Sequence, residues 1–223
     1  MLLAQTTYTA AEIIQIVVLT LRVTLSAIVL AVLLGLPAGI ALALSAFPGR
    51  KIVLAIINTL MGLPPVIAGL AVALALWRNG PLGPLQLIYT KTGIVIAQCI
   101  IAAPIIAGLT ASAIQQLNQN LKTQALALGA TRLQMIWTLI LEARLALLAA
   151  IMAGYGRVIA EVGAVMIVGG NIRHDTRVLT TAIVLETRKG NFTYAIALGA
   201  ILMALAFTIN LALTHVQHKR MAQ

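Results

Sequence analysis

Five long apolar runs constrain this chain more than any other feature of its sequence. Two of them, residues 23–49 and 52–77, contain no charged residue at all. A helix that crosses a lipid bilayer needs about 20 mostly apolar residues, so each run is long enough to do so. The sequence therefore predicts an all-α membrane protein that forms a single transmembrane domain over residues 1–223. The expected spans cover residues 13–47, 52–77, 92–114, 143–168 and 192–214.

The composition excludes a fold that faces mainly water. Only 9% of the 223 residues are charged and the mean hydropathy is +1.03, whereas about 25% of residues are charged in an ordinary soluble domain. The net charge of +10 does not indicate nucleic-acid binding, because the basic residues are spread between apolar runs and only 4% of residues are aromatic. Basic residues at the ends of apolar segments are typical of membrane topology instead.

No metal, cofactor or nucleotide site is expected in this chain. Cys99 is the one cysteine and lies in an apolar run, so it cannot form an intramolecular disulfide or a metal cluster. The three histidines share no metal-ligand spacing with acidic residues. The phosphate-binding pattern Gly-x-x-x-x-Gly-Lys-Ser/Thr does not occur, so the chain cannot bind ATP by that device.

A polar, helix-forming insert interrupts the apolar pattern near the middle of the chain. It reads "ALALGATRLQMIWTLILEARLAL", from Ala125 to Leu147. The residues before Gly129 favour a helix, the glycine allows a turn, and a second helix is expected to start at "ATRLQMIW". Such a pair of short helices would project from the bilayer, although an amphipathic loop lying on the membrane interface is the alternative.

The insert resembles the cytoplasmic coupling loop of ABC importer permeases. In that pattern three residues separate Glu-Ala-Ala from a glycine, and here Thr123-Gln124-Ala125 and Gly129 take those places. Two departures are Thr123 in place of the acidic residue and Glu142 in place of a later proline. The resemblance implies that a loop over residues 115–142 docks onto a separate ATPase subunit. The residues expected at that contact are Ala125, Leu128, Gly129, Ala130, Arg132 and Leu133.

The stretch after the fourth run resembles the oxyanion branch of these permeases, and is most similar to the tungstate permease subfamily. The matching residues are Ala160, Glu161, Gly163, Asn171, Ile172, Thr176, Leu179, Ala182 and Ile183. The resemblance implies the type I importer permease fold and a non-catalytic subunit that transports tungstate, with molybdate or another oxyanion as the alternative. It also implies as partners two ATPase copies, an extracytoplasmic binding protein and a second copy of this chain.

Orientation in the membrane follows from the resemblance and not from charge. Basic residues are divided equally between the two sides of a five-span topology, so the positive-inside rule does not decide it. A cytoplasmic coupling loop implies an outer N-terminus and a cytoplasmic C-terminus, in the inner or cell membrane of a bacterium or archaeon.

Two features of the spans suggest a translocation pathway or gate. Arg157 and Glu161 are four residues apart, which places them on one face of a continuous helix, and a charge at mid-membrane costs about 2.5–3.5 kcal/mol on insertion scales. They form either a structural ion pair or part of the pathway. Pro64 and Pro65 break the second span, for packing or to line the pathway. The full candidate set is Pro64, Pro65, Arg157, Glu161, Gly163 and Asn171.

The predicted outer loop, residues 169–191, carries four basic and two acidic residues. Arg173 and Arg177 are expected to dock the binding protein or to contact the anion directly. Two rival classes of function stay open at this point. One is an ion-driven secondary carrier with Glu161 as its proton site, and the other is a non-transporting membrane scaffold.

Overall fold

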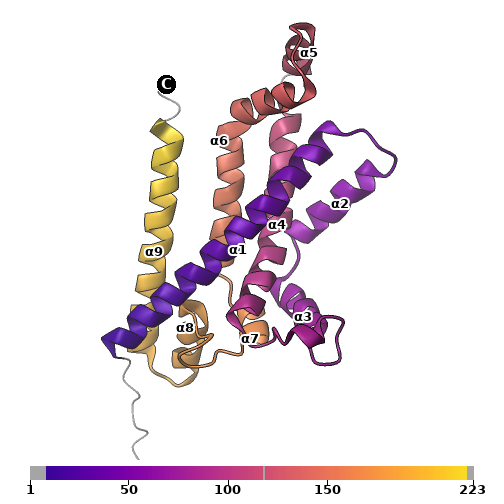
Figure 1. Ribbon diagram of the computed structural model, residues 1–223. Helices are drawn as coiled ribbons and strands as arrows, with labels where there is room; N and C mark the ends of the chain where they lie inside the picture. Colours follow the sequence, from indigo (N-terminus) through magenta and orange to yellow (C-terminus); the bar gives the residue numbers. More distant parts are fainter. Residues whose placement is uncertain (1–8, 118, 220–223) are drawn as a thin grey trace, which may run out of the picture. The chain divides into compact units, whose positions relative to one another are not determined.

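The computed structural model describes residues 9–117 and 119–219 of the chain (Figure 1). Every regular element in these residues is a helix. The chain divides into two compact units, each assembled from separate segments. The first unit takes the described residues up to Ser26, together with Pro65–Gln98 and Ile159–Leu205. The second takes Ala27–Pro64, Cys99–Val158 and the described residues from Ala206 onward.

Four of the described helices are long and apolar enough to cross a membrane. They are α1 (Ala10–Leu44), α4 (Lys91–Gln115), α6 (Arg132–Ile159) and α9 (Phe192–Lys219). A fifth crossing results if the broken pair α2 (Arg50–Met61) and α3 (Pro65–Leu76) counts as one span. The predicted all-α membrane fold is therefore confirmed, with four to five helices of the expected length and hydropathy.

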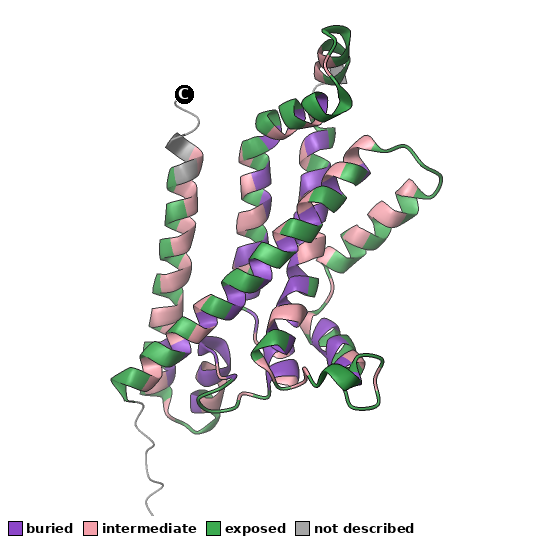
Figure 2. Ribbon diagram, viewed as in Figure 1, coloured by how far each residue is buried: buried purple, intermediate pink, exposed green. Residues whose placement is uncertain are grey.

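The core of the first unit joins segments that are far apart in the sequence. Ile16 of α1 packs with Leu179 and Ala182 of α8 (Leu179–Arg188) and with Leu198 of α9. A second cluster joins α1 and α4 to α7 (Gly163–Gly169), around Val165. The remaining element of this unit is the short 3₁₀ helix η1 (Gly83–Leu85). Figure 2 shows α7 and α8 coloured mainly as buried.

The second unit is held by close helix packing and by a smaller apolar core. A Cβ added at Gly39 of α1 would lie 2.5 Å from the carbonyl oxygen of Ala107 in α4, so the two helix backbones are in contact. Small residues permit such approach where lipid supplies no hydrophobic force. Ile114, Ala143 and Leu147 form the core of the unit. The helix α5 (Gln119–Ala127) precedes α6.

The structure differs from the expected spans around α6. This helix begins at Arg132, inside the predicted coupling loop, and ends at Ile159 instead of residue 168. Residues 160–162 are not helical, and a separate helix, α7, follows them. The predicted outer loop also contains a whole helix, α8. Hydropathy alone does not locate these breaks, because the residues on both sides of each are apolar.

Candidate functional site: coupling turn, helix breaks and outer cluster

The turn between α5 and α6 depends on a glycine and on a capping box. Gly129 has φ +83°, in the left-handed region that glycine adopts without steric cost. The amide of Ala130 donates to the carbonyl of Ala125 (3.0 Å), which closes the end of α5. At the start of α6 the amide of Gln134 donates to Oγ1 of Thr131, and the Thr131 amide donates to Oε1 of Gln134 (2.8 Å). This reciprocal arrangement satisfies two free donors of the helix start.

Large apolar side chains are exposed around this turn. Leu128 is 88% exposed, Leu133 80% and Trp137 63%. We call these three residues the coupling tip. A cluster of exposed large apolar side chains marks a surface that contacts another protein or lipid. The predicted contact residues Gly129 and Arg132 lie exposed beside the tip, and Ala125 and Ala130 are half-buried there.

Two helix breaks divide runs that the sequence analysis expected to be single spans. The first separates α2, which ends at Met61, from α3, which begins at Pro65. Proline suits the first position of a helix because its missing N–H has no intrahelical acceptor there. The second break follows Ile159 and precedes Gly163.

The helices that begin after these two breaks, α3 and α7, pack directly against each other. A Cβ added at Gly69 of α3 would lie 2.5 Å from Cα of Ala164 in α7, closer than any real side-chain carbon approaches. A Cβ added at Gly163 would lie 2.7 Å from Cγ2 of Val66. The structure therefore brings the predicted residues Pro65 and Gly163 to neighbouring positions at the starts of two packed helices.

Glu161 lies within the second break and is only 7% exposed. Its Oε1 accepts a hydrogen bond from the amide of Ala164 (2.9 Å), and its backbone carbonyl accepts one from Oγ1 of Thr180 (2.9 Å). The carboxylate thus satisfies a donor in the first turn of α7 that has no intrahelical acceptor. Arg157 is exposed on α6. Because α6 ends at Ile159, the expectation that Arg157 and Glu161 share one helical face is wrong.

The outer loop is fastened to α1 by a network of charged and polar groups. Nε and Nη2 of Arg173 donate to Oε1 of Glu12 (2.9 and 2.5 Å), and Nε2 of His174 lies 3.4 Å from the same oxygen. Nε2 of Gln15 donates to the carbonyl of His174 (2.9 Å). Arg173, predicted as a docking residue, is therefore already ion-paired within the chain.

Asn171 and Arg177 interact with each other in the same loop. Nε of Arg177 donates to Oδ1 of Asn171 (3.1 Å), and Nη2 donates to its carbonyl (3.3 Å). Asn171 has φ +53°, which asparagine tolerates better than most residues. Asn171, predicted as a pathway residue, and Arg177, predicted as a docking residue, thus belong to one loop structure.

The partners of these residues are not evident from the sequence. Glu12 is separated from Arg173 by 161 positions, and no local pattern indicates that pairing. One local signal was available, because Thr9 and Glu12 form a capping box at the start of α1. Across residues 9–117 and 119–219, no three His, Cys, Asp or Glu side chains are placed to hold a metal ion.

These features define a helical membrane protein with several crossings and a projecting helical turn. A family model described as "Binding-protein-dependent transport system inner membrane component" matches residues 35–222. The chain belongs to this family, the permease subunits of ABC importers. It is accordingly a non-catalytic inner-membrane subunit, and ATP hydrolysis belongs to a separate subunit.

Similar proteins agree with that assignment. A "Probable anion ABC transporter permease protein" of Haloferax volcanii is 42% identical over 202 residues, which is 88% of this chain and 87% of the relative. The "Tungstate uptake system permease protein TupB" of Peptoclostridium acidaminophilum is 38% identical, covering 93% and 91% of the two chains. Among solved structures, the inward-facing MetNI methionine ABC transporter matches with a TM-score of 0.74, at 20% identity and over 94% and 96% of the chains. This last likeness shows the type I importer permease fold.

Proposed function

We propose that this chain forms the translocation pathway of an ATP-driven importer of a tetrahedral oxyanion, with tungstate as the cargo and molybdate as the alternative. The observation that carries the importer mechanism is the exposed coupling tip beside the left-handed Gly129. The choice of tungstate is supported by the relative of 38% identity that is named a tungstate permease. The relative of 42% identity, named an anion permease, supports the wider class.

The proposed assembly contains two copies of this chain, two ATPase subunits and an extracytoplasmic binding protein. In this scheme the coupling tip docks into the ATPase, so that opening and closing of the ATPases moves α5 and the start of α6. Rigid-body movement of the attached spans then exposes the pathway to each side in turn. Arg173, Arg177 and the rest of the outer loop are proposed to face the binding protein.

The helix breaks are proposed to line the pathway. Non-helical backbone at membrane depth is tolerated only where protein or water satisfies it, and broken helices are a recurrent way to build a site within a transporter. Pro64, Pro65, Glu161 and Gly163 are at or beside such breaks. Arg157 and Asn171 are proposed as further groups that the anion meets, since one is an exposed cation on a span and the other carries an amide at a left-handed bend.

The test is uptake into vesicles that hold the permease and its ATPase, with the binding protein outside. We expect tungstate uptake to need ATP within the compartment that contains the ATPase, and to be inhibited more by molybdate than by sulfate. Uptake driven by a proton gradient without ATP would contradict the proposal and favour a secondary carrier. Failure of the chain to transport any oxyanion while it binds an ATPase would favour a scaffold.

Glu161 provides a sharper comparison between the importer and a proton-driven carrier. Glu161→Gln retains an oxygen that accepts the Ala164 hydrogen bond, so we expect assembly and ATP-driven uptake within about twofold of the unmodified protein. Glu161→Ala removes that acceptor, and by analogy with helix-cap losses should lower stability by about 0.5–2 kcal/mol. A carrier that protonates Glu161 would lose all uptake in Glu161→Gln. Uptake that a proton gradient drives in the unmodified protein and that this variant lacks would refute the importer mechanism.

A further inference from the structure

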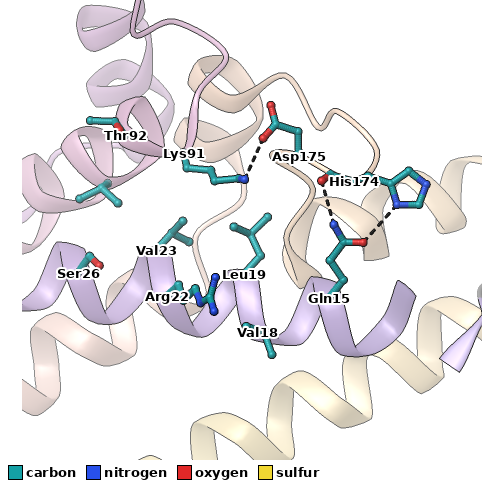
Figure 3. A pocket seen from close by; sticks show the side chains of 11 residues that line it. Gln15, Val18, Leu19, Arg22, Val23, Ser26, Lys91, Thr92, His174 and Asp175 are labelled. Carbon is teal, nitrogen blue, oxygen red and sulfur yellow. Dashed lines mark hydrogen bonds and ion pairs between the residues drawn. The ribbon is translucent and has the colours of Figure 1, made fainter. Parts of the chain in front are cut away.

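A pocket of about 430 Å³ lies within the first unit, between α1, the start of α4 and the outer loop (Figure 3). Its volume falls in the range of small-ligand sites, about 300–1,000 Å³. Its polar lining comes from three separate segments of the chain. These polar residues are Gln15, Arg22, Ser26, Lys91, Thr92, His174 and Asp175.

Arg22 brings to this pocket a positive charge that no described side chain neutralises. It stands twelve positions after the first residue of α1, in a helix whose only other charged residue is Glu12. Among the described residues Arg22 makes no hydrogen bond and no ion pair. The acidic residue of the same helix, Glu12, is paired with Arg173 instead. A cation in a membrane-spanning helix needs a partner or water, so the open pocket explains how Arg22 is tolerated.

The pocket lies along a polar face of α1. Gln15, Arg22 and Ser26 are seven and four positions apart, which places them on one side of the helix. The other polar residues in this part of α1, Thr20 and Thr24, are buried, and Thr20 accepts a hydrogen bond from the amide of Leu179. The polar face is therefore separate from the hydroxyls that serve packing.

Lys91 brings a second cation to the same pocket. It is the first residue of α4, where the positive end of the helix dipole disfavours a cation. Nζ of Lys91 lies 3.1 Å from Oδ1 of Asp175, with about half of each side chain exposed. Asp175 therefore neutralises Lys91, and Arg22 remains as an excess positive charge in the pocket.

We propose that this pocket binds a tetrahedral oxyanion between Arg22 and Lys91, with Thr92 and Ser26 as hydroxyl donors. The guanidinium of Arg22 presents paired N–H donors that match two oxygens of such an anion. Asp175 competes with the anion for Lys91, so binding exchanges one negative partner for another. The anion is either free cargo or the phosphate of a membrane lipid, which offers the same oxygen chemistry. The inference rests on the proposed function only in its choice of tungstate as probe.

The test uses the purified complex of the permease with its ATPase, in maltoside micelles without phospholipid. Sodium tungstate is titrated by calorimetry into the unmodified complex and three variants. Arg22→Gln should weaken binding by roughly tenfold or more, as expected for a lost charge-assisted hydrogen bond. Asp175→Asn should strengthen it several-fold, because the competing carboxylate is gone. Arg188→Gln removes the same charge from an exposed position outside the pocket and should change binding by less than about twofold.

A second measurement separates the two sources of the oxyanion. Native mass spectrometry counts the phosphatidylglycerol molecules retained by complexes purified from anionic membranes. If tungstate does not bind but Arg22→Gln retains fewer of these lipids than Arg188→Gln, the pocket holds a lipid phosphate. If Arg22→Gln matches Arg188→Gln in both measurements, the proposal is overturned. Because neither measurement involves uptake, failure of this pocket leaves the proposed transport function standing, and failed uptake leaves the binding result intact.

Discussion

Gly129 sets the backbone conformation of the turn between α5 and α6. Its φ of +83° lies in the region that side chains rarely adopt, and nothing lies within 4 Å of a Cβ added there. The constraint at this position is therefore the backbone conformation and not a lack of space. The glycine directs the chain from α5 into α6 and so sets where the exposed Leu128 and Leu133 point.

We expect Gly129→Leu to separate the permease from its ATPase. An L-residue in the left-handed conformation costs about 1–2 kcal/mol, so the turn would change shape and co-purification of the ATPase should fall roughly tenfold. Gly199→Leu is the matched control, because that glycine also has open space around its Cβ position but lies in the regular helix α9. Normal ATPase binding by Gly129→Leu would show that the coupling assignment is mistaken.

Among the elements of the first unit, α3 and α7 pack against each other backbone to backbone. Gly69 faces Ala164 with no room for a side chain, and Gly163 faces Val66 in the same way. Two helices that each begin at a break are thereby fixed to one another. Such an arrangement allows non-helical backbone to be held by protein while it borders a pathway.

We expect Gly69→Ala and Gly156→Ala to change stability in opposite directions. The added methyl at Gly69 would meet backbone atoms of Ala164, and overpacking of this kind costs about 1–3 kcal/mol. At Gly156 of α6 nothing lies within 4 Å of the new Cβ, and alanine in a helix is favoured over glycine by about 0.5–1 kcal/mol. Thermal unfolding of the purified complex measures both. If the two variants unfold at the same midpoint temperature, α3 and α7 are not packed backbone to backbone.

For the molecule as a whole, the number of membrane crossings decides on which sides of the membrane the two ends of the chain lie. Four long apolar helices and the broken pair α2–α3 give an odd count when that pair crosses as one span. The two ends of the chain then lie on opposite sides of the membrane. In the proposed orientation the coupling tip is cytoplasmic and α8 is near the outer surface.

Cysteine labelling tests that orientation with two exposed positions. In a Cys99→Ala background, we expect an impermeant thiol reagent to label Arg188→Cys in intact cells and Leu128→Cys only after the membrane is opened. Both original side chains are exposed, so accessibility within the protein does not distinguish them. Labelling of Leu128→Cys alone in intact cells would show that the topology is the reverse of the proposed one. Thr6, an alternative labelling position near the N-terminus, lies outside the described residues.

Features that depend on neighbouring residues could be predicted from the sequence alone. Hydropathy over about 20 positions indicated the long apolar helices, and local backbone preferences indicated the turn at Gly129, since both are properties of a short stretch of chain. The break after α6 depends on tertiary contacts as well, since the backbone carbonyl of Glu161 accepts a hydrogen bond from Thr180 of α8. Tertiary contacts also pair Glu12 with Arg173 and bring Arg22 and Lys91 into one pocket. These contacts join residues far apart in the chain, and hydropathy and local periodicity carry no information about which distant residues meet.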